Sequence, residues 1–515
     1  CAKADHLRHD GRGGERMKKQ RVFHRSAGIL LPIASLPSPY GIGTFGKSTY
    51  DFVDNLAKAR QKFWQVLPLG PTSYGDSPYA SFSAFAGNPY FIDLDILIEE
   101  ELLDKDYVES FMWNMEDRYV DYGLLYKSRF KVLRTAFQNS RHQDSKEYQE
   151  FLKEQAYWLE EYCLYSACKN KFDGTSWTEW EKEAKFRKPE MLDELKEELS
   201  EDIEFYKFVQ FKFFEQWNKL KTYANEKQIE IIGDIPIYVA MDSADVWQHT
   251  DLFQLDEELN PKKVAGVPPD AFSDSGQRWG NPLYDWKKIE AEDFLWWRKR
   301  MEHSAKLYDV IRIDHFIGMV KYYAIPAESE DARTGQWELG PGMKLITVIN
   351  ESIGSKKIIA EDLGVKMQEV TEVLEKSGYP GMKVLEFAFD GDRKNEHLPY
   401  NWIPNMAAYG GTHDNDTLVG YFTGLQPWEL GYIREYMECR DGSVEDLVDK
   451  IFGTAYAGVA NLVIFQMQDV LKIGNIGRMN LPSSMGTNWR WRMSEGQFGE
   501  KEIERLRYLC DIYGR

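Results

Sequence analysis

Four acidic residues lie at or near the ends of short apolar runs, where a carboxylate can do chemistry. They are Asp234, Asp314, Glu361 and Asp414. Burying a carboxylate at the end of a strand costs free energy unless the group is paired with a partner or has a role in function. Several carboxylates gathered in one cleft can supply an acid, a nucleophile and a charge stabiliser. These are the groups that break and form glycosidic bonds.

Arg312 and Asp314 lie two residues apart in the run that begins at Val310. Alternation along a strand places both side chains on the same face. An arginine there can hold the carboxylate ionised and fix its rotamer, and an ionised aspartate can attack an anomeric carbon. A buried Arg–Asp pair that only stabilises the strand explains these two residues equally well.

Glu361 ends the next apolar run along the chain, Ile358-Ile-Ala-Glu361. A glutamate near an apolar wall keeps its proton to higher pH and can act as a general acid. Helix capping is the structural alternative, and it fits the neighbouring Asp362 better than Glu361. If the strands before Asp314 and Glu361 are neighbours, the two carboxyl groups lie at about the 5–5.5 Å separation of retaining chemistry.

The segment Thr412-His-Asp-Asn-Asp-Thr417 is dense in donors and acceptors. One interpretation is that it binds substrate hydroxyls, with Asp414 opposing the positive charge of an oxocarbenium-like ring. A metal site through His413, Asp414 and Asp416 is disfavoured, because hard cations draw on more oxygen ligands. An Asn/Asp turn without function is also open. Asp234 either contacts substrate or pairs with Arg312.

Eight apolar runs with strand character predict the elements that position these residues. They are apolar on both faces, as buried parallel strands are, and the helical patterns Ser48–Gln61, Trp286–Leu307 and Met367–Ser377 lie between some of them. This alternation predicts an α/β fold, a (β/α)₈ TIM barrel whose strands end at one mouth. The runs are Ala27–Ile33, Phe63–Leu69, Ile229–Ile237, Val310–Phe316, Lys357–Leu363, Met382–Phe389, Ala407–Thr412 and Val463–Met467.

The spacing of the runs predicts the domain organisation. Residues 1–16 are polar and unpatterned, so we expect an upstream extension before a native start at Met17. We expect the barrel to be formed by residues 17–98 and 201–515. The stretch between them, 99–200, is expected to be an inserted helical subdomain. Its predicted helices are Tyr122–Phe137, Lys146–Lys171 and Met191–Leu199. The Gly- and Pro-rich stretch near 255–286 is expected to be an ordered loop over the substrate.

Composition and charge exclude several classes of function. The chain has 515 residues and a net charge of −19, which disfavours nucleic acid as a partner. Aromatic residues make up 14% of the chain, and their rings can stack on sugar faces or simply fill the core. Five cysteines without metal-ligand spacing suit a reducing cytoplasm. No run is long enough to cross a membrane, and nothing demands a metal or an organic cofactor.

Several motifs together carry a resemblance to a known family. Four segments resemble the signature regions of the α-amylase superfamily, and specifically its amylomaltase branch, the 4-α-glucanotransferases or disproportionating enzymes: Gly233–Val239, Arg312–Phe316, Glu361–Gly364 and Gly411–Thr417. Further matches occur in the same order as in that family: Ser35–Gly43, Ser77–Pro89, Gly266–Asp270, Gly276–Pro282 and Asn488–Arg492. Their number and order make the resemblance specific.

The resemblance implies a role for each matching residue. Asp314 corresponds to the nucleophile, Glu361 to the general acid/base and Asp414 to the stabiliser of the transition state in a retaining double displacement. The implied sugar-binding residues are Tyr79, Asp234, Arg312 and His413, with Phe272, Gln277 and Trp279 on the covering loop. The implied partners are maltooligosaccharides and other α-1,4-glucans, with glucose as an acceptor; the oligomeric state is not implied.

Two departures from the family pattern and two rival functions stay open. Ala271 stands where an aromatic residue is common beside Phe272, which puts a stacking contact in doubt, and Ile317 stands where an arginine often follows Phe316. An α-glucan hydrolase on the same carboxylates is the alternative enzyme, although the Gly276–Pro282 motif disfavours it. A non-catalytic glucan-binding protein would not need all three carboxylates. A Schiff-base aldolase lacks a lysine at a strand end.

Overall fold

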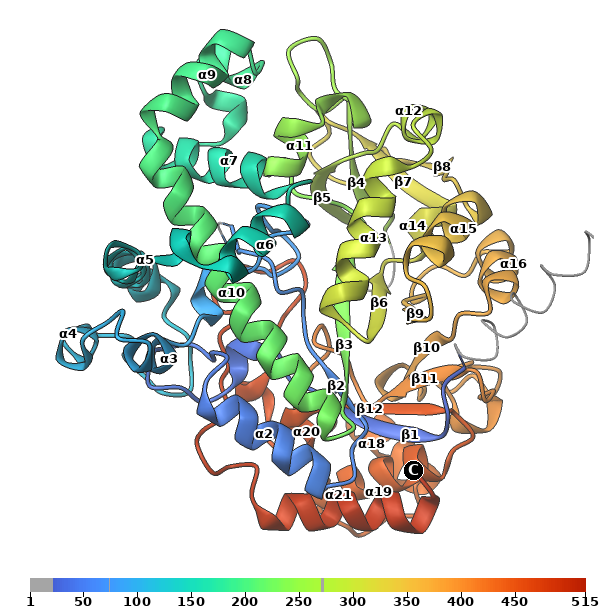
Figure 1. Cartoon of the computed structure of the whole chain (residues 1–515). Coiled ribbons are helices and arrows are strands. Elements are labelled where there is room, and N and C mark those ends of the chain that lie inside the picture. The colour runs from blue at the N-terminus through green and yellow to red at the C-terminus, as the bar shows by residue number, and fades with distance from the viewer. Residues whose placement is uncertain (1–21, 74, 270–272) are drawn as a thin grey trace, which may run out of the picture.

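Eight parallel strands form the sheet that carries the predicted carboxylates (Figure 1). The computed structural model describes residues 22–73, 75–269 and 273–515 of the chain. The strand order is β10-β11-β12-β1-β2-β3-β6-β9. The strands are β1 (Ser26–Leu30), β2 (Phe63–Gln65), β3 (Glu230–Pro236), β6 (Val310–Asp314), β9 (Lys357–Ala360), β10 (Gly381–Val384), β11 (Met406–Tyr409) and β12 (Leu462–Gln466).

The sheet closes on itself between its two outer strands. The N–H of Ala360 in β9 donates to the carbonyl of Pro380, the residue before β10, over 2.9 Å. Each predicted run overlaps one of the eight strands, and the predicted (β/α)₈ barrel is confirmed. Most of the predicted runs are longer than the strands because apolar residues continue into the turns at the barrel mouth.

Helices surround the barrel (Figure 1). The stretch 286–307, predicted as one helix, forms two helices, because Asp293 and Phe294 adopt left-handed φ angles of 52° and 54°. The stretch 146–171, also predicted as one helix, likewise forms two helices. The helices that follow or flank the strands are α2 (Lys47–Lys58), α10 (Ser200–Glu226), α11 (Ala244–Gln248), α12 (Trp286–Ala291), α13 (Leu295–Leu307), α14 (Ile317–Val320), α15 (Met343–Ser352), α16 (Gln368–Ser377), α17 (Leu418–Gly424), α18 (Pro427–Tyr436), α19 (Val444–Ala457), α20 (Met467–Val470) and α21 (Glu500–Tyr513).

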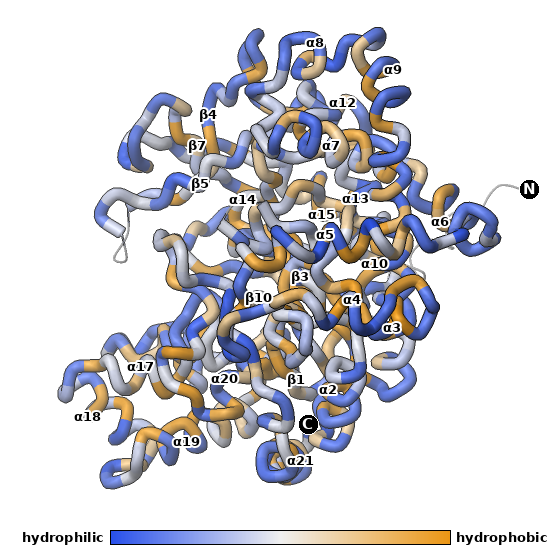
Figure 2. The backbone as a smooth tube through the Cα atoms, turned by 90° about the vertical axis from the view of Figure 1, so that its left-hand side faces the viewer, coloured by the Kyte–Doolittle hydropathy of each residue, from blue (hydrophilic) through white to orange (hydrophobic). Residues whose placement is uncertain are grey.

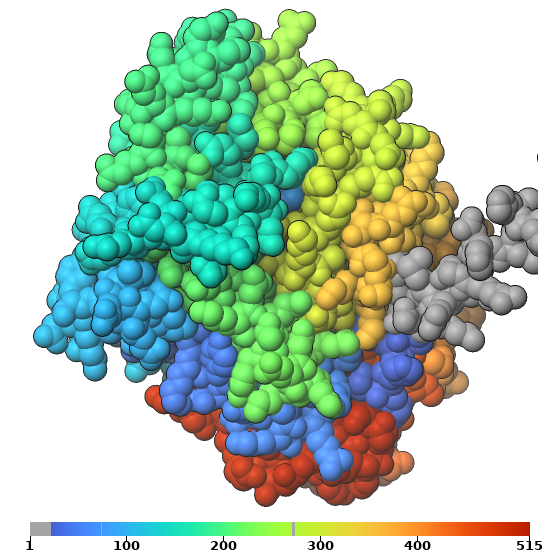
Figure 3. Space-filling model, in the orientation of Figure 1, coloured from blue at the N-terminus to red at the C-terminus, as the bar shows by residue number. Residues whose placement is uncertain are grey.

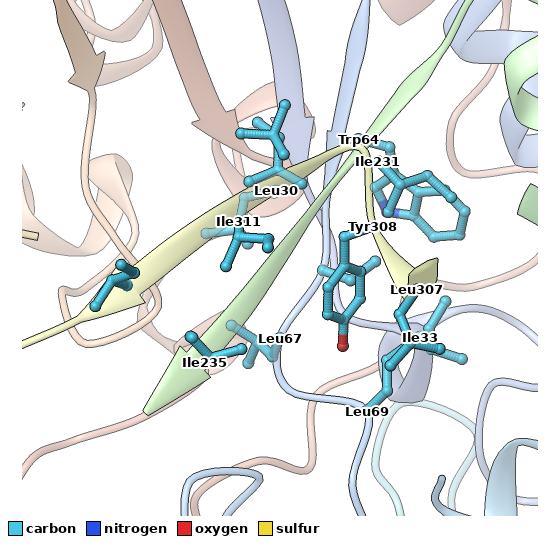
Figure 4. Close-up of a cluster of buried hydrophobic side chains, with 14 of the residues drawn as sticks. Leu30, Ile33, Trp64, Leu67, Leu69, Ile231, Ile235, Leu307, Tyr308 and Ile311 are labelled. Carbon is cyan, nitrogen blue, oxygen red and sulfur yellow. The ribbon is translucent and has the colours of Figure 1, made fainter. Parts of the chain in front are cut away.

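The core lies inside the barrel and between its strands and helices. Figure 4 shows Trp64, Ile231 and Ile311, from three neighbouring strands, around the ring of Tyr308. Gly233 in β3 makes room for that ring, since a Cβ there would lie 2.2 Å from the Tyr308 ring. The core therefore fixes how β3 and β6 approach each other, and these two strands carry Asp234, Arg312 and Asp314.

A second sheet stands beside the barrel mouth and was not predicted. Its order is β5-β4-β7-β8, with all pairs antiparallel. Two of its strands lie in the stretch for which the sequence predicted a loop, and that prediction is corrected here. The pairing of β4 with the distant β7 creates these strands, and their glycines and polar residues hide them in the sequence. The strands are β4 (Lys263–Val267), β5 (Gln277–Pro282), β7 (Lys321–Pro326) and β8 (Gln336–Leu339).

The chain between β2 and β3 is helical. In Figure 3 its helices cover the upper left of the molecule, and the long α10 runs from them down to the barrel. Whether residues 99–200 form a separate subdomain stays a prediction, because α10 packs both against the helices of this stretch and against the barrel. The helices are α3 (Leu94–Glu99), α4 (Lys105–Glu109), α5 (Tyr122–Asn139), α6 (Lys146–Glu154), α7 (Leu159–Lys171), α8 (Lys182–Lys185) and α9 (Pro189–Glu198).

The outer surface is mainly polar. Figure 2 shows hydrophilic stretches along the outermost loops and helix faces. In the part of the chain that the structure describes, no helix combines the length and the apolar character needed to span a membrane.

Candidate active site

The guanidinium of Arg312 joins two of the predicted carboxylates. Its Nη1 donates to both oxygens of Asp234, at 2.8 and 2.7 Å, and to Oδ1 of Asp314 at 3.0 Å. The strand register explains this contact, since Arg312 lies opposite Asp234 in the β3–β6 pair. Burial alone would lower the pKa of Arg312, but the charges of Asp234 and Asp314 more than offset it and hold that pKa above its usual range. Arg312 is therefore a fixed positive charge beside Asp314.

Asp234 is the buried partner of Arg312 and lies inside β3, not at its end. Only 1% of Asp234 is exposed, and its Oδ2 also accepts the hydroxyl of Tyr79 over 2.7 Å. Of the two roles left open by the sequence, the structure shows the pairing with Arg312. Charge-assisted hydrogen bonds such as these are roughly twice as strong as neutral ones, so they fix the Arg312 rotamer.

Tyr79 and His413 stack on one another at the barrel mouth. Their ring centroids lie 5.1 Å apart with an interplanar angle of 15°. Trp489 lies against both rings, at 5.8 Å from Tyr79 and 5.9 Å from His413. Trp489 was not predicted as a site residue, although its motif Asn488–Arg492 was recognised. These three rings form an aromatic wall next to the Arg312 pair.

Glu361 is the first residue after β9 and lies beside Asp314. Ile313 and Ala360 are partners in the β6–β9 register, so the two acids are the next residues along neighbouring parallel strands. Each carboxylate oxygen of Glu361 accepts one backbone N–H, from His315 over 2.7 Å and from Leu363 over 2.9 Å. Burial, helped by the charge of Asp314, nevertheless raises the pKa of Glu361 to about 8. At neutral pH Glu361 therefore carries the proton that a general acid needs.

Asp414 lies in the loop beyond β11, five residues past the last residue of that strand. Its Oδ1 accepts the side-chain amide of Asn480 over 2.6 Å, and its Oδ2 lies 3.5 Å from Nε2 of His413. The Asp414 side chain is 47% exposed, in contrast to the buried Asp234 and Glu361. It is therefore placed to face a bound molecule.

The second sheet brings Trp279 to the site. The Trp279 ring meets His315 edge-on, with 4.8 Å between centroids and an angle of 87°. Its indole N–H donates to Oε1 of Gln277 over 3.1 Å, so Gln277 reaches the site through Trp279. Phe272 and Ala271, the other predicted positions on this segment, lie outside the described residues.

His315 is a site residue that the sequence did not single out. It directly follows Asp314, and its backbone φ of 53° turns its N–H toward Glu361. Burial lowers the pKa of His315 to about 4, so the ring is neutral at ordinary pH. Its Nε2 is buried and has no hydrogen-bond partner among the described residues. A polar residue next to a candidate nucleophile was the signal that could have identified it.

The segment Thr412–Thr417 holds itself together without a metal-binding set. Oδ1 of Asn415 accepts both the N–H and the hydroxyl of Thr412, each over 2.9 Å, and Asp416 accepts the amide of Asn475 over 3.0 Å. Across the described ranges, no group of three or more His, Cys, Asp and Glu side chains is arranged to hold a metal ion.

Comparison with known proteins gives consistent matches along the chain. A family model described as 4-alpha-glucanotransferase matches residues 31–497. The 4-alpha-glucanotransferase of Clostridium butyricum is 49% identical over 488 residues, which cover 94% of this chain and 100% of that protein. That of Thermus thermophilus is 43% identical, with 95% of this chain and 99% of the relative covered.

Solved structures agree with these sequence matches. The amylomaltase of Streptococcus agalactiae, in complex with acarbose, superposes with a TM-score of 0.91 at 40% identity, over 95% of this chain and 99% of that one. The amylomaltase of Corynebacterium glutamicum has a TM-score of 0.79 at 18% identity, covering 96% of this chain and 76% of that one, which shows the same fold.

Proposed function

The chain belongs to the 4-alpha-glucanotransferase family, glycoside hydrolase family 77, and we propose how the residues at its barrel mouth perform the transfer. The enzyme is a 4-alpha-glucanotransferase, and its substrates are α-glucans. The observation that carries the proposal is the pairing of two carboxyl groups that lie in different surroundings. An arginine-bound Asp314 lies on the strand next to Glu361, whose pKa is about 8. Two carboxyl groups set apart in this way are the usual mark of an acid and a nucleophile.

Asp314 is the proposed nucleophile. Its Oδ1 accepts a hydrogen bond from Arg312 over 3.0 Å, which fixes the direction of the carboxylate and leaves the other oxygen outside this contact. That carboxylate attacks the anomeric carbon of the donor glucan, and the bond from this carbon to the glycosidic oxygen breaks. The product is a covalent glycosyl-enzyme with inverted configuration at that carbon.

Glu361 is the proposed general acid and base. In the first step its proton passes to the glycosidic oxygen, so the leaving glucan departs as a neutral alcohol. Glu361 is then a carboxylate and takes the proton from the 4-hydroxyl of an incoming acceptor, whose oxygen displaces Asp314. The second inversion restores the original configuration and returns the proton to Glu361, so the cycle is balanced.

Asp414 and the aromatic wall are proposed to bind the sugar ring that reacts. The Asp414 carboxylate opposes the positive charge that develops as the ring becomes oxocarbenium-like. His413 and Tyr79 lie next to it, and their stacked rings hold one side of the pocket. Arg312 and Asp234 complete the sugar-binding set proposed from the sequence, with Asp234 acting through Arg312.

Transfer must prevail over hydrolysis although water is abundant. We assign this to the segment that carries Gln277, Trp279 and Phe272, which excludes water and orients an acceptor hydroxyl. Trp279 supports this role because its ring contacts His315, the residue after the proposed nucleophile. Removal of Phe272 is expected to raise the ratio of hydrolysis to transfer.

The finer substrate assignment follows from the same site. We propose maltooligosaccharides and other α-1,4-glucans as donors and glucose or shorter glucans as acceptors. The likeness to an amylomaltase that was solved with acarbose supports a pocket for an oligosaccharide. The uncharged substrate also suits a protein with a net charge of −19.

The product profile from pure maltotriose tests the proposal. Purified enzyme is incubated with maltotriose, and products are separated by chromatography over time. Glucose together with a ladder of longer maltooligosaccharides is the expected result. Glucose and maltose without longer chains would instead show a hydrolase, and unchanged maltotriose with intact glucan binding would show a non-catalytic protein.

A further inference from the structure

Arg478 lies against the loop that carries Asp414, and its guanidinium makes two contacts with that loop and one with its own segment. Its Nη2 donates to the backbone carbonyl of Asp414 over 3.0 Å, and its Nε donates to the carbonyl of Asn480 over 2.9 Å. Its Nη1 lies 3.8 Å from a carboxylate oxygen of Asp416. One guanidinium thus connects the Asp414 loop to the segment that follows β12.

Asn480 links this segment directly to the carboxylate of Asp414. Its side-chain amide donates to Oδ1 of Asp414 over 2.6 Å, while the other oxygen has His413 at 3.5 Å. The Asp414 side chain is about half exposed, so packing alone does not fix its rotamer. The bond from Asn480 is therefore the short contact that sets the direction of this carboxylate.

The surroundings explain why an arginine is needed at this position. Glu386 and Asp469 lie behind the same loop, and each has a buried carboxylate oxygen without a hydrogen-bond partner among the described residues. Burial raises the pKa of Asp469 to about 7 and that of Glu386 above its usual range, with a contribution from Asp416 in both cases. The charge of Arg478 acts in the opposite direction on Glu386. Arg478 therefore supplies a positive charge beside this group of acidic side chains.

We propose that Arg478 is a positioning residue for the transfer reaction. It acts by fixing the backbone of Asp414 and the backbone of Asn480, whose side-chain amide orients the Asp414 carboxylate. The proposal rests on the role of Asp414 proposed above. Arg478 does not touch the substrate in this account. Lysine cannot replace it fully, because a single ammonium lacks the planar fork that reaches several acceptors at once.

A purely structural role makes a different prediction. The segment from Met479 to Trp489 is closed at its base by a backbone bond, from the Trp489 N–H to the Met479 carbonyl over 2.7 Å. If Arg478 only stabilised this segment, its loss would lower the melting temperature and would not interact specifically with Asp414. A double-mutant cycle separates the two cases.

The test compares Arg478→Gln and Arg478→Lys with Asp414→Asn and with the combined variants. Transfer is followed with maltotriose, and slow variants with an activated α-glycosyl fluoride donor, with the melting temperature measured for each. We expect Arg478→Gln to lower kcat about 10–100-fold, more than it raises KM, and Arg478→Lys to lie in between. In the Asp414→Asn background the same substitution should change the rate less than about 2-fold.

Arg434 provides the matched control. Its guanidinium also binds backbone carbonyls, including that of Cys439 over 3.1 Å, but in the connection between α18 and α19. Arg434→Gln should lower the melting temperature and leave kcat within about 2-fold of the unmodified enzyme. Should Arg478→Gln fail to fold, Arg478→Lys and Asn480→Ala take its place in the cycle.

The outcomes distinguish this inference from the function on which it rests. An Arg478→Gln variant with normal kcat, or one whose loss is the same with and without Asp414, overturns the positioning role. Near-normal transfer by Asp414→Asn overturns the proposed role of Asp414 itself. An inactive Asp414→Asn with a normal Arg478→Gln leaves the function standing and removes the inference alone.

Discussion

The Glu361 carboxylate accepts a hydrogen bond from the backbone N–H of His315, the residue directly after Asp314, over 2.7 Å. The N–H of Glu361 in turn donates to the carbonyl of Ile313 over 3.0 Å. The proposed acid/base and the proposed nucleophile are therefore joined through the main chain. Their relative position does not depend on the side chain at position 315.

The first prediction concerns pH. Glu361 must be protonated to act as an acid, and its pKa is about 8 in the free enzyme. We expect kcat/KM for transfer from maltotriose to be level toward neutral pH and to fall up to tenfold per pH unit above about 8, because the protonated fraction falls. Initial rates measured across this range check the prediction.

Unfolding must be separated from titration in that experiment. The melting temperature is recorded at each pH, and the enzyme is returned to neutral pH to confirm that activity recovers. An alkaline limb centred near the ordinary glutamate pKa of about 4.3 would contradict the burial effect on Glu361.

The second prediction compares the two ends of strand β6. Asp314→Asn should reduce turnover by about a thousandfold or more, because the amide cannot form the covalent intermediate, while the fold is kept. Asp309→Asn, just before the same strand, is the control. Asp309 accepts the N–H of Ile231 over 3.0 Å, so its loss should cost about 1–3 kcal/mol of stability and spare kcat.

Turnover with maltotriose and denaturant unfolding of both variants check this pair. Equal losses of turnover at positions 314 and 309 would mean that Asp314 acts only through stability. Near-normal turnover of Asp314→Asn would remove it as the nucleophile.

The third prediction concerns the hydroxyl of Tyr79, which donates to Asp234. Tyr79→Phe removes one donor from a buried carboxylate and loosens the Asp234–Arg312 pair. A loss of about 1–2 kcal/mol corresponds to a 5–30-fold drop in kcat/KM, which steady-state kinetics measures. Tyr165→Phe is the matched control, because the Tyr165 hydroxyl donates to Asp242 over the same 2.7 Å, away from the Arg312 pair. Comparable kinetic losses in both variants would contradict a specific role for Tyr79.

The fourth prediction concerns Trp279, a residue that is 38% exposed and whose ring lies beside His315. Trp279→Ala should admit water and weaken acceptor binding, so the ratio of hydrolysis to transfer should rise while the fold is unchanged. Counting new reducing ends against longer products measures this ratio. Trp428→Ala on α18, where the ring is 73% exposed, should leave it unchanged. An unaltered ratio for Trp279→Ala would remove this residue from the water-excluding segment.

The barrel was predictable because its strands are buried on both faces and so appear as continuous apolar runs. The acids near the ends of these runs were visible for the same reason. Asp314 and Glu361 fall where the parallel strands end, and the register of β6 and β9 then brings them side by side. Local composition was enough to identify the candidate acids and the barrel that gathers them.

Long-range pairing was not predictable from local patterns. The second sheet exists because β4 pairs with the distant β7, and a pairing between segments this far apart leaves no mark in the local sequence of either strand. The same holds for Trp489, which reaches Tyr79 from the far end of the chain. A sequence shows the elements, but it does not show which distant segments lie beside each other.

The sequence by itself determined the fold class and supplied the candidate acids, because residue types and burial periodicity are local properties. Only the tertiary structure decided how these acids are oriented and protonated. It paired Asp234 with Arg312, turned the His315 N–H toward Glu361 and placed Asn480 on Asp414. It also raised the pKa of Glu361 through burial beside Asp314. Protonation and orientation depend on distances between groups from separate segments, and folding alone sets those distances.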